Sequence, residues 1–110
     1  MSFLYILDTS PEFPVKNVAI DYSVNGHWKR DVVDLTFKRA STEDIETLRT
    51  QKPVEVVRSQ LVGWDRVKDL QGNPVEFTED TKAGFLLVLP AVAAAARAFW
   101  DNQVKGNEKN

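Results

Sequence analysis

Few residues of this chain have side chains that could carry out covalent or metal chemistry. The 110 residues contain no cysteine, which excludes a thiolate nucleophile, a disulfide framework and cysteine-ligated zinc. His27 is the only histidine, and no nucleophile-elbow motif, phosphate-binding loop or dinucleotide-binding glycine pattern accompanies it. We therefore expect His27 to be a solvated residue beside a turn. We also expect the protein to be no enzyme and to use no cofactor.

One cluster of carboxylates could in principle hold a cation. Glu43, Asp44 and Glu46 lie close together, but they directly follow Ser41-Thr42. A hydroxyl residue followed by acids is typical of the first turn of a helix, where the acids face the positive end of the helix dipole. We therefore predict a helix start here and no metal site. A catalytic carboxylate pair brought together only by folding stays open as an alternative.

The composition is that of one ordinary globular domain, 1–110, with flexible ends at about 1–12 and 103–110. The chain is 43% hydrophobic and 27% charged, with a net charge of −2. The acidic balance argues against a nucleic-acid partner, because such binding depends on phosphate neutralisation by basic side chains. Two basic pairs, Lys29-Arg30 and Lys38-Arg39, are expected to be solvated strand ends.

No segment predicts a signal peptide or a membrane span. Residues 1–10 lack a basic lead and an apolar region of adequate length. The longest uncharged apolar run, 83–96, is 14 positions long and contains Pro90. That is shorter than the roughly 20 residues that a membrane helix needs. We expect this run to form buried helix and the protein to have no membrane partner.

The strongest local signal predicts a β-hairpin. Two β-rich runs, 15–24 and 28–39, flank Asn25-Gly26, a pair that accepts the positive φ angles of a type I′ turn. A two-residue loop pairs Val24 with His27 and Val18 with Val33. This register places one set of apolar residues on one face: Val18, Ile20, Tyr22, Val33, Leu35 and Phe37. The opposite face carries Asp21, Arg30, Asp34 and Lys38.

Helix signals follow the hairpin. Ser41 is expected to cap a short helix containing Ile45 and Leu48, and Pro53 suits the first turn of a second helix that ends at Gly63-Trp64. The stretch 65–77 reads as a connection with a turn at 71–74. The second helix carries an apolar stripe made of Val54, Val57 and Leu61, with Val56 beside it.

Thr78 is expected to cap the C-terminal helical region. The run 85–89 has apolar side chains on all sides, as in a buried helix, and Pro90 either kinks this helix or starts a new one. An apolar stripe continues through Val92, Ala95, Ala96 and Phe99. The predicted fold class is therefore α+β: an N-terminal antiparallel β-hairpin followed by three to four α-helices.

The order of these features resembles the tail assembly chaperones of long, non-contractile-tailed phages and prophages. The resemblance extends over roughly 15–100. It includes Phe37-Lys38-Arg39 at the end of the hairpin, Leu61 to Asp65, and Leu86 to Pro90 before an alanine-rich helix that leads to Phe99-Trp100. Its most specific part lies between Trp64 and Thr78 and reads Asp-x-x-Gly-x-Pro-Val-x-Phe-Thr from Asp69.

The resemblance implies a protein that binds the phage tape measure protein, keeps it soluble and helps to recruit the tail tube protein. Such chaperones act in the cytoplasm of the bacterial host and are absent from the mature virion. The family often makes a longer product by −1 frameshifting, and Glu108-Lys109-Asn110 can be encoded by a slippery A AAA AAC sequence. The alternative is a small phage structural protein of the tail or head-tail joint, of terminator or connector type.

Spare apolar surface is what a protein-binding role requires. We predict it at the hairpin tip and along the last helix, and self-association into a homo-oligomer stays open. Phe99 and Trp100 are neighbours in sequence, so one is expected in the core, while Trp64 is expected to pack between helix and loop. The predicted protein-binding residues are Tyr22, Val24, Trp28, Val92, Ala96, Phe99 and Trp100.

Overall fold

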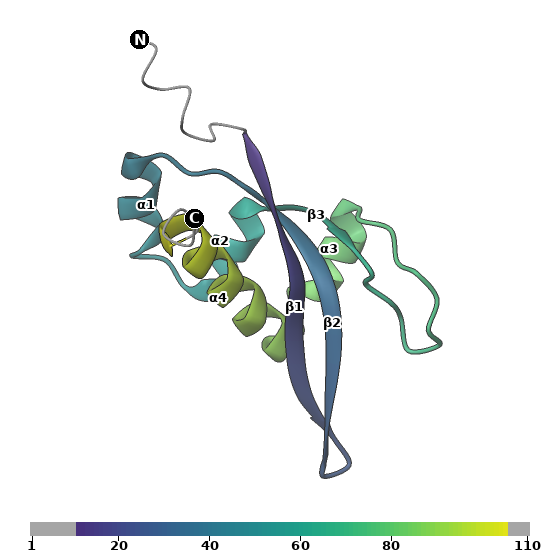
Figure 1. The fold of residues 1–110 in the computed structure, drawn as a ribbon. Helices are drawn as coiled ribbons and strands as arrows, with labels where there is room; N and C mark the ends of the chain where they lie inside the picture. The colour runs from purple at the N-terminus through teal and green to yellow at the C-terminus, as the bar shows by residue number, and fades with distance from the viewer. Residues whose placement is uncertain (1–10, 106–110) are drawn as a thin grey trace.

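The computed structural model describes residues 11–105, and it confirms an α+β fold (Figure 1). An antiparallel sheet with the strand order β1-β2-β3 packs against helices. The elements in chain order are β1 (Glu12–Val24), β2 (His27–Lys38), α1 (Thr42–Leu48), α2 (Pro53–Gln60), β3 (Leu61–Asp65), α3 (Glu79–Phe85) and α4 (Leu89–Lys105).

The hairpin has the predicted register. Val24 pairs with His27 and Val18 with Val33, and both turn residues have positive φ, 53° at Asn25 and 80° at Gly26. The sequence analysis did not anticipate a β-bulge between Val15 and Val18, where Asn17 has a φ of 60°. Such a bulge bends and twists the strand locally.

Strand β1 begins earlier than predicted. Glu12 already pairs with Lys38, and Phe13 is buried, so the strand starts before the predicted run 15–24 and within the predicted flexible end at about 1–12. At the other end, α4 continues to Lys105, beyond the start of the predicted flexible end at 103. The remaining parts of the two predicted flexible ends, 1–10 and 106–110, lie outside the described residues, as do residues 108–110 of the suggested slippery sequence.

A third strand replaces the predicted last turn of the second helix. Helix α2 ends at Gln60, and Leu61 begins β3, which pairs antiparallel with β2 through Leu35↔Trp64 and Thr36↔Gly63. The spacing of Val57 and Leu61 fits a helix stripe, but Leu61 is buried in the sheet instead. Pairing with β2 satisfies the backbone groups of this segment, and that tertiary gain outweighs the local helical pattern.

The predicted helix starts are confirmed. Ser41 caps α1 in a capping box with Asp44, and Pro53 occupies the first turn of α2. Thr78 caps α3, accepting a hydrogen bond from the Thr81 N–H at 3.1 Å. The first N–H groups of a helix have no partner within the helix. Ser41 and Thr78 accept hydrogen bonds from such groups, and Pro53 has no N–H group that needs a partner.

The run 85–89 is not the predicted buried helix. Helix α3 ends at Phe85, which is buried, whereas Leu87 and Leu89 are largely exposed. Pro90 starts a new helix and does not kink an existing one, because α3 and α4 meet at an angle of 101°. Pro90 cannot donate to a preceding carbonyl, so it suits the first turn of α4.

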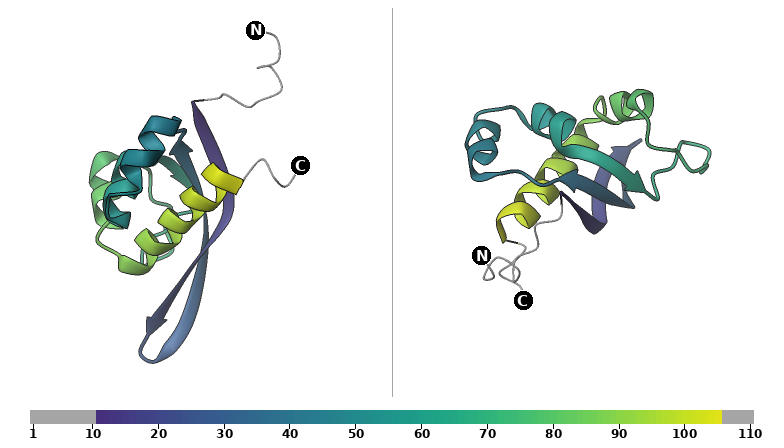
Figure 2. Two further views of the ribbon diagram at one scale, coloured as in Figure 1. Left: turned by 90° about the vertical axis from the view of Figure 1, so that its left-hand side faces the viewer. Right: turned by 90° about the horizontal axis from the view of Figure 1, so that it is seen from above.

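The core lies between one face of the sheet and the helices that cover it (Figure 2). Helix α4 packs against β1 and α2. Phe37 and Phe99 are both fully buried, with ring centres 5.6 Å apart, and Phe13 completes the cluster. Aromatic packing of this kind joins the first strand, the second strand and the last helix into one unit.

Within residues 11–105, no single helix is long and apolar enough to cross a membrane. Helices α3 and α4 pass the same test of length and composition only as a pair bent by 101°.

Candidate protein-binding groove

An apolar groove of about 870 Å³ lies between the hairpin, the 66–75 loop and the α3–α4 junction. Its floor and walls come from three separate segments, each contributing apolar side chains beside a few charged ones. The hairpin contributes Ile20, Tyr22, Val24 and the consecutive residues 29–33; the loop contributes Val67, Leu70 and Val75; the helical segment contributes Phe85, Val88 and Ala91.

The loop wall is held in place by Trp64. The indole Nε1 donates a hydrogen bond to the Val75 carbonyl at 2.8 Å, and the Trp64 ring packs against Phe77 and Phe85 at 4.9 and 5.3 Å between centres. Trp64 thus connects β3 to the end of the 66–75 loop and to α3, as predicted for a residue that packs between helix and loop. A bridge between Lys68 and Pro74 closes the loop on itself.

A polar clamp fixes the chain where it leaves β3. The Arg66 guanidinium donates to both carboxylate oxygens of Asp34, from Nη2 at 2.6 Å and from Nε at 3.1 Å, and also to Asn17 Oδ1 at 2.7 Å. The Asn17 N–H donates to the same carboxylate at 3.0 Å. The hydrogen bonds from Arg66 and then from Asn17 lower the pKa of Asp34 to about 2.

The backbone of Arg66 explains why the groove exists. Arg66 has a φ of 66°, a left-handed conformation that a side-chain-bearing residue adopts rarely. The chain therefore turns away from β2 after Asp65, whose partner is Asp34. Strand β2 continues for seven further residues without a neighbour on this side among the described residues, and five of them, 29–33, form the groove floor.

Exposed apolar side chains surround the groove. Leu70 is fully exposed at the loop tip, and Val88 is 48% exposed at the α3–α4 junction. Monomeric proteins seldom leave several large apolar side chains exposed in one region unless that region binds something. This arrangement has the chemistry that suits binding of an apolar segment.

A second cleft, of about 680 Å³, lies on the other side of the hairpin. Trp28 lines it with Pro90, Ala93 and Arg97 of α4. The Trp28 side chain is 76% exposed, so it is not covered by the helices. The ion pair between Arg30 and Asp21 at 2.6 Å lies along the same cleft.

The structure does not gather the predicted protein-binding residues into one surface. Tyr22 and Val24 line the groove, whereas Trp28 lies on the opposite face of the hairpin because it pairs with Ser23. The predicted exposed surface along the last helix is wrong for Val92, Ala96 and Phe99, which face the sheet and are buried. As expected, one of the two neighbouring aromatics is core: Phe99 is buried, and Trp100 is half-buried against its ring, 5.1 Å away.

Sequence reasoning missed most of the groove. Val67, Leu70, Val75 and Val88 were not singled out, because the first three lie in the polar connection 65–77 and Val88 lies in a run that resembled a buried helix. The sequence feature that could have indicated the groove is Leu70, a large apolar residue isolated in a turn-rich segment. Leu70 is fully exposed and so has no part in the core.

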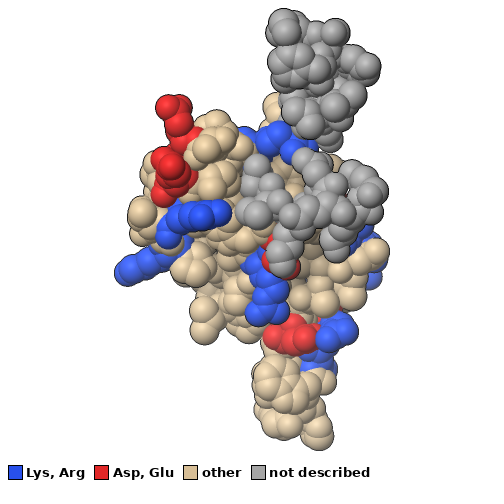
Figure 3. Space-filling model, turned by 60° about the vertical axis from the view of Figure 1, so that its left-hand side comes forward, with Lys and Arg blue, Asp and Glu red and all other residues tan. Residues whose placement is uncertain are grey.

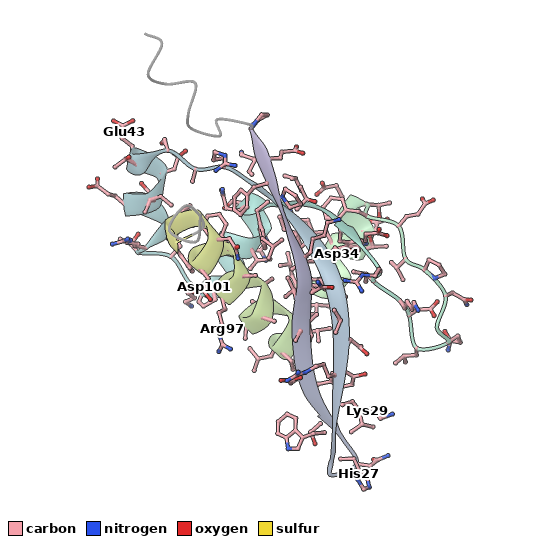
Figure 4. All side chains as sticks on the ribbon, viewed as in Figure 1. His27, Lys29, Asp34, Glu43, Arg97 and Asp101 are labelled. Atoms are coloured by element: carbon pink, nitrogen blue, oxygen red, sulfur yellow. The ribbon has the colours of Figure 1, made fainter. Side chains whose placement is uncertain are left out.

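Charged side chains form no metal-binding cluster in the part of the chain described. Among residues 11–105, no group of three His, Asp or Glu side chains could hold a metal ion. His27 lies at the exposed hairpin end, and Glu43 lies on the far side of the molecule (Figure 4). The face shown in Figure 3 carries interspersed basic and acidic groups and no basic stripe.

These features define an α+β protein with an open apolar groove built on an unpaired strand edge. No model of a known protein family, no curated protein and no solved structure matches this chain.

Proposed function

We propose that this chain is a phage tail assembly chaperone that acts in the cytoplasm of the bacterial host. It binds the tape measure protein, keeps that protein soluble, helps to recruit tail tube subunits and is absent from the mature virion. No catalysis, cofactor, membrane or nucleic acid is part of this role. The observation that carries the proposal is the apolar groove beside the hairpin.

The groove suits a protein that shields apolar segments of another chain. Binding removes exposed apolar surface from water and lowers the population of aggregating species. The lining combines large apolar side chains with basic Lys29 and Lys68 and acidic Asp31 and Asp69. Because both signs of charge are present, the apolar side chains carry the match to a partner segment.

The residues that carry the resemblance are those that build the groove wall. Within the stretch from Trp64 to Thr78, Trp64 bonds Val75, Phe77 packs on Trp64, and Thr78 caps α3. The most specific part of the resemblance is thus a structural device that positions the 66–75 loop and the α3–α4 junction. This link between motif and surface supports the proposed role.

Co-expression with the tape measure protein of the encoding phage or prophage tests the proposal. The chain should keep the tape measure protein in the soluble fraction and copurify with it. Leu70→Asp should reduce this copurification at least tenfold, because a charge at the rim cannot be buried against an apolar segment. Leu87→Asp changes another largely exposed leucine that does not line the groove, and should have little effect.

Two outcomes would contradict the proposal. A tape measure protein that stays insoluble and unbound would exclude the chaperone role. Detection of the chain in purified virions would favour the alternative, a terminator or connector protein that remains in the particle.

A further inference from the structure

The floor of the groove is an open strand edge. Adjacent residues in a strand direct their N–H and C=O groups to opposite sides. In a hairpin with a two-residue turn, His27 bonds to Val24, so Lys29, Asp31 and Val33 also bond to β1. Trp28, Arg30 and Val32 therefore direct their backbone groups away from β1, where β3 no longer extends.

An open edge beside apolar walls fits an extended apolar segment. Such a segment can pair with the edge through its backbone and place its side chains in the groove. The chain carries one segment of this type outside the described residues, Phe3-Leu4-Tyr5-Ile6-Leu7. Aromatic and branched apolar residues favour strands, and all five are apolar, so either face of the strand suits the groove.

This segment cannot pair along its full length with the groove edge of its own chain. The groove begins at the level of Val33, which pairs with Val18, seven residues along β1 from Pro11. At about 3.3 Å per residue this distance is about 23 Å. Leu7 is four residues from Pro11 and reaches about 14 Å at most. Phe3, eight residues from Pro11, reaches about 28 Å, so only the first residues of the segment could touch the groove of their own chain. The segment 3–7 as a whole can pair along the edge only on another molecule.

We infer that residues 3–7 of one copy add a strand to the β2 edge of a second copy and cover its apolar groove. Each molecule carries both the segment and the groove, so association can be reciprocal or can continue from copy to copy. The inference goes beyond the proposed function: it assigns a second occupant to the groove, and this occupant competes with a partner segment.

Light scattering across a concentration series tests the inference. The full chain should show a mass above that of one 12.5 kDa chain, and the mass should rise with concentration. A variant lacking residues 2–10, which keeps every described element, should have the mass of one chain. A full chain that stays monomeric throughout, or a truncated chain with the mass of the full one, would overturn the inference.

Point variants test the same contact without shortening the chain. The double variant Leu4→Asp/Ile6→Asp in the segment, and Val88→Asp in the groove, should each raise the self-association Kd at least tenfold, which corresponds to about 1.4 kcal/mol. Leu87→Asp is the matched control for Val88→Asp, and should leave the Kd within about threefold. If Leu87→Asp and Val88→Asp raised the self-association Kd equally, the groove would be excluded as the site of self-association.

Hydrogen exchange identifies the strand edge itself. A peptide of residues 1–11, added to the truncated chain, should slow exchange at the Arg30 and Val32 amides, which point to the open edge. The Asp31 and Val33 amides, bonded to β1, should change little. If the peptide bound but slowed exchange at all four amides alike, or at none of them, strand addition would be excluded. Failure to bind the tape measure protein would refute the proposed function but leave these results unaffected.

Discussion

At the residue scale, the Arg66 side chain determines where β3 ends and where the 66–75 loop begins. It donates two hydrogen bonds to Asp34 and one to Asn17, and the Asp34 side chain is only 14% exposed. Bidentate pairing of arginine with a carboxylate fixes geometry as well as charge. The same residue adopts a positive φ, so the clamp holds a backbone conformation that would otherwise be disfavoured.

The variant Arg66→Met should raise the pKa of Asp34 from about 2 towards its ordinary value, because the largest stabilising interaction of the carboxylate is lost. An NMR titration of the Asp34 carboxyl group measures this pKa directly. Arg58→Met is the control, since Arg58 pairs with Glu55 on the surface of α2. An unchanged pKa of Asp34 in Arg66→Met would contradict the role of the clamp.

The clamp also predicts a pH dependence of stability. The pKa of Asp34 is lower in the folded chain than in the unfolded one, so the ionised carboxylate stabilises the fold above pH 4. This contribution is lost as the pH falls from about 4 to about 2. The difference in unfolding free energy between the natural chain and Arg66→Met should shrink over the same range. A difference that stays constant with pH would show that Arg66 acts through packing alone.

Two aromatic residues of the predicted surface should differ sharply in their effect on stability. Phe99→Ala should lower the unfolding free energy by roughly 3–5 kcal/mol, because Phe99 is fully buried between Phe13 and Phe37. Trp28→Ala should change it by no more than about 0.5 kcal/mol, because Trp28 is mostly exposed. Urea unfolding measures both, and similar losses in the two variants would contradict the burial described above.

At the element scale, α3 depends on its cap. The helix has seven residues, too few to be stable without tertiary packing and capping. Thr78→Ala should therefore lower the unfolding free energy by about 1 kcal/mol, whereas Thr78→Ser, which keeps the hydroxyl group, should retain most of the stability. Urea unfolding of the two variants gives the comparison. Equal stability of Thr78→Ala and the natural chain would mean that Phe85 packing alone holds α3.

The elements differ in how well the sequence predicted them, and the reason is physical. Asn25-Gly26, Ser41 and Thr78 act through local geometry, so their sequence signals gave the correct hairpin and helix starts. Leu61 and Leu87 depend on distant partners: pairing with β2 converts Leu61 from helix to strand, and the sharp turn before Pro90 leaves Leu87 outside the core. The groove depends on those same distant contacts, which local patterns do not encode.

At the scale of the whole molecule, the hairpin extends beyond the core. The described chain measures 55 × 26 × 26 Å, and its radius of gyration of 15.1 Å exceeds the roughly 13 Å typical of a compact domain of about 100 residues. The lower half of the hairpin is the projecting part (Figure 1). Its residues 29–33 form the floor of the groove. Few buried contacts support it, because buried strand residues end at Ile20 and Val33.

This shape predicts a gradient of stability along one hairpin. Local opening needs less free energy where few apolar contacts are lost, so the β1-bonded amides near the tip, such as Lys29, should exchange through local fraying. The amide of Phe37, bonded within the aromatic core, should exchange only through global unfolding. Native-state hydrogen exchange in increasing denaturant separates the two, because only global opening depends strongly on denaturant. Equal denaturant dependence at both positions would mean that the projecting hairpin unfolds together with the core, and that its groove-facing edge is held as rigidly as the rest of the sheet.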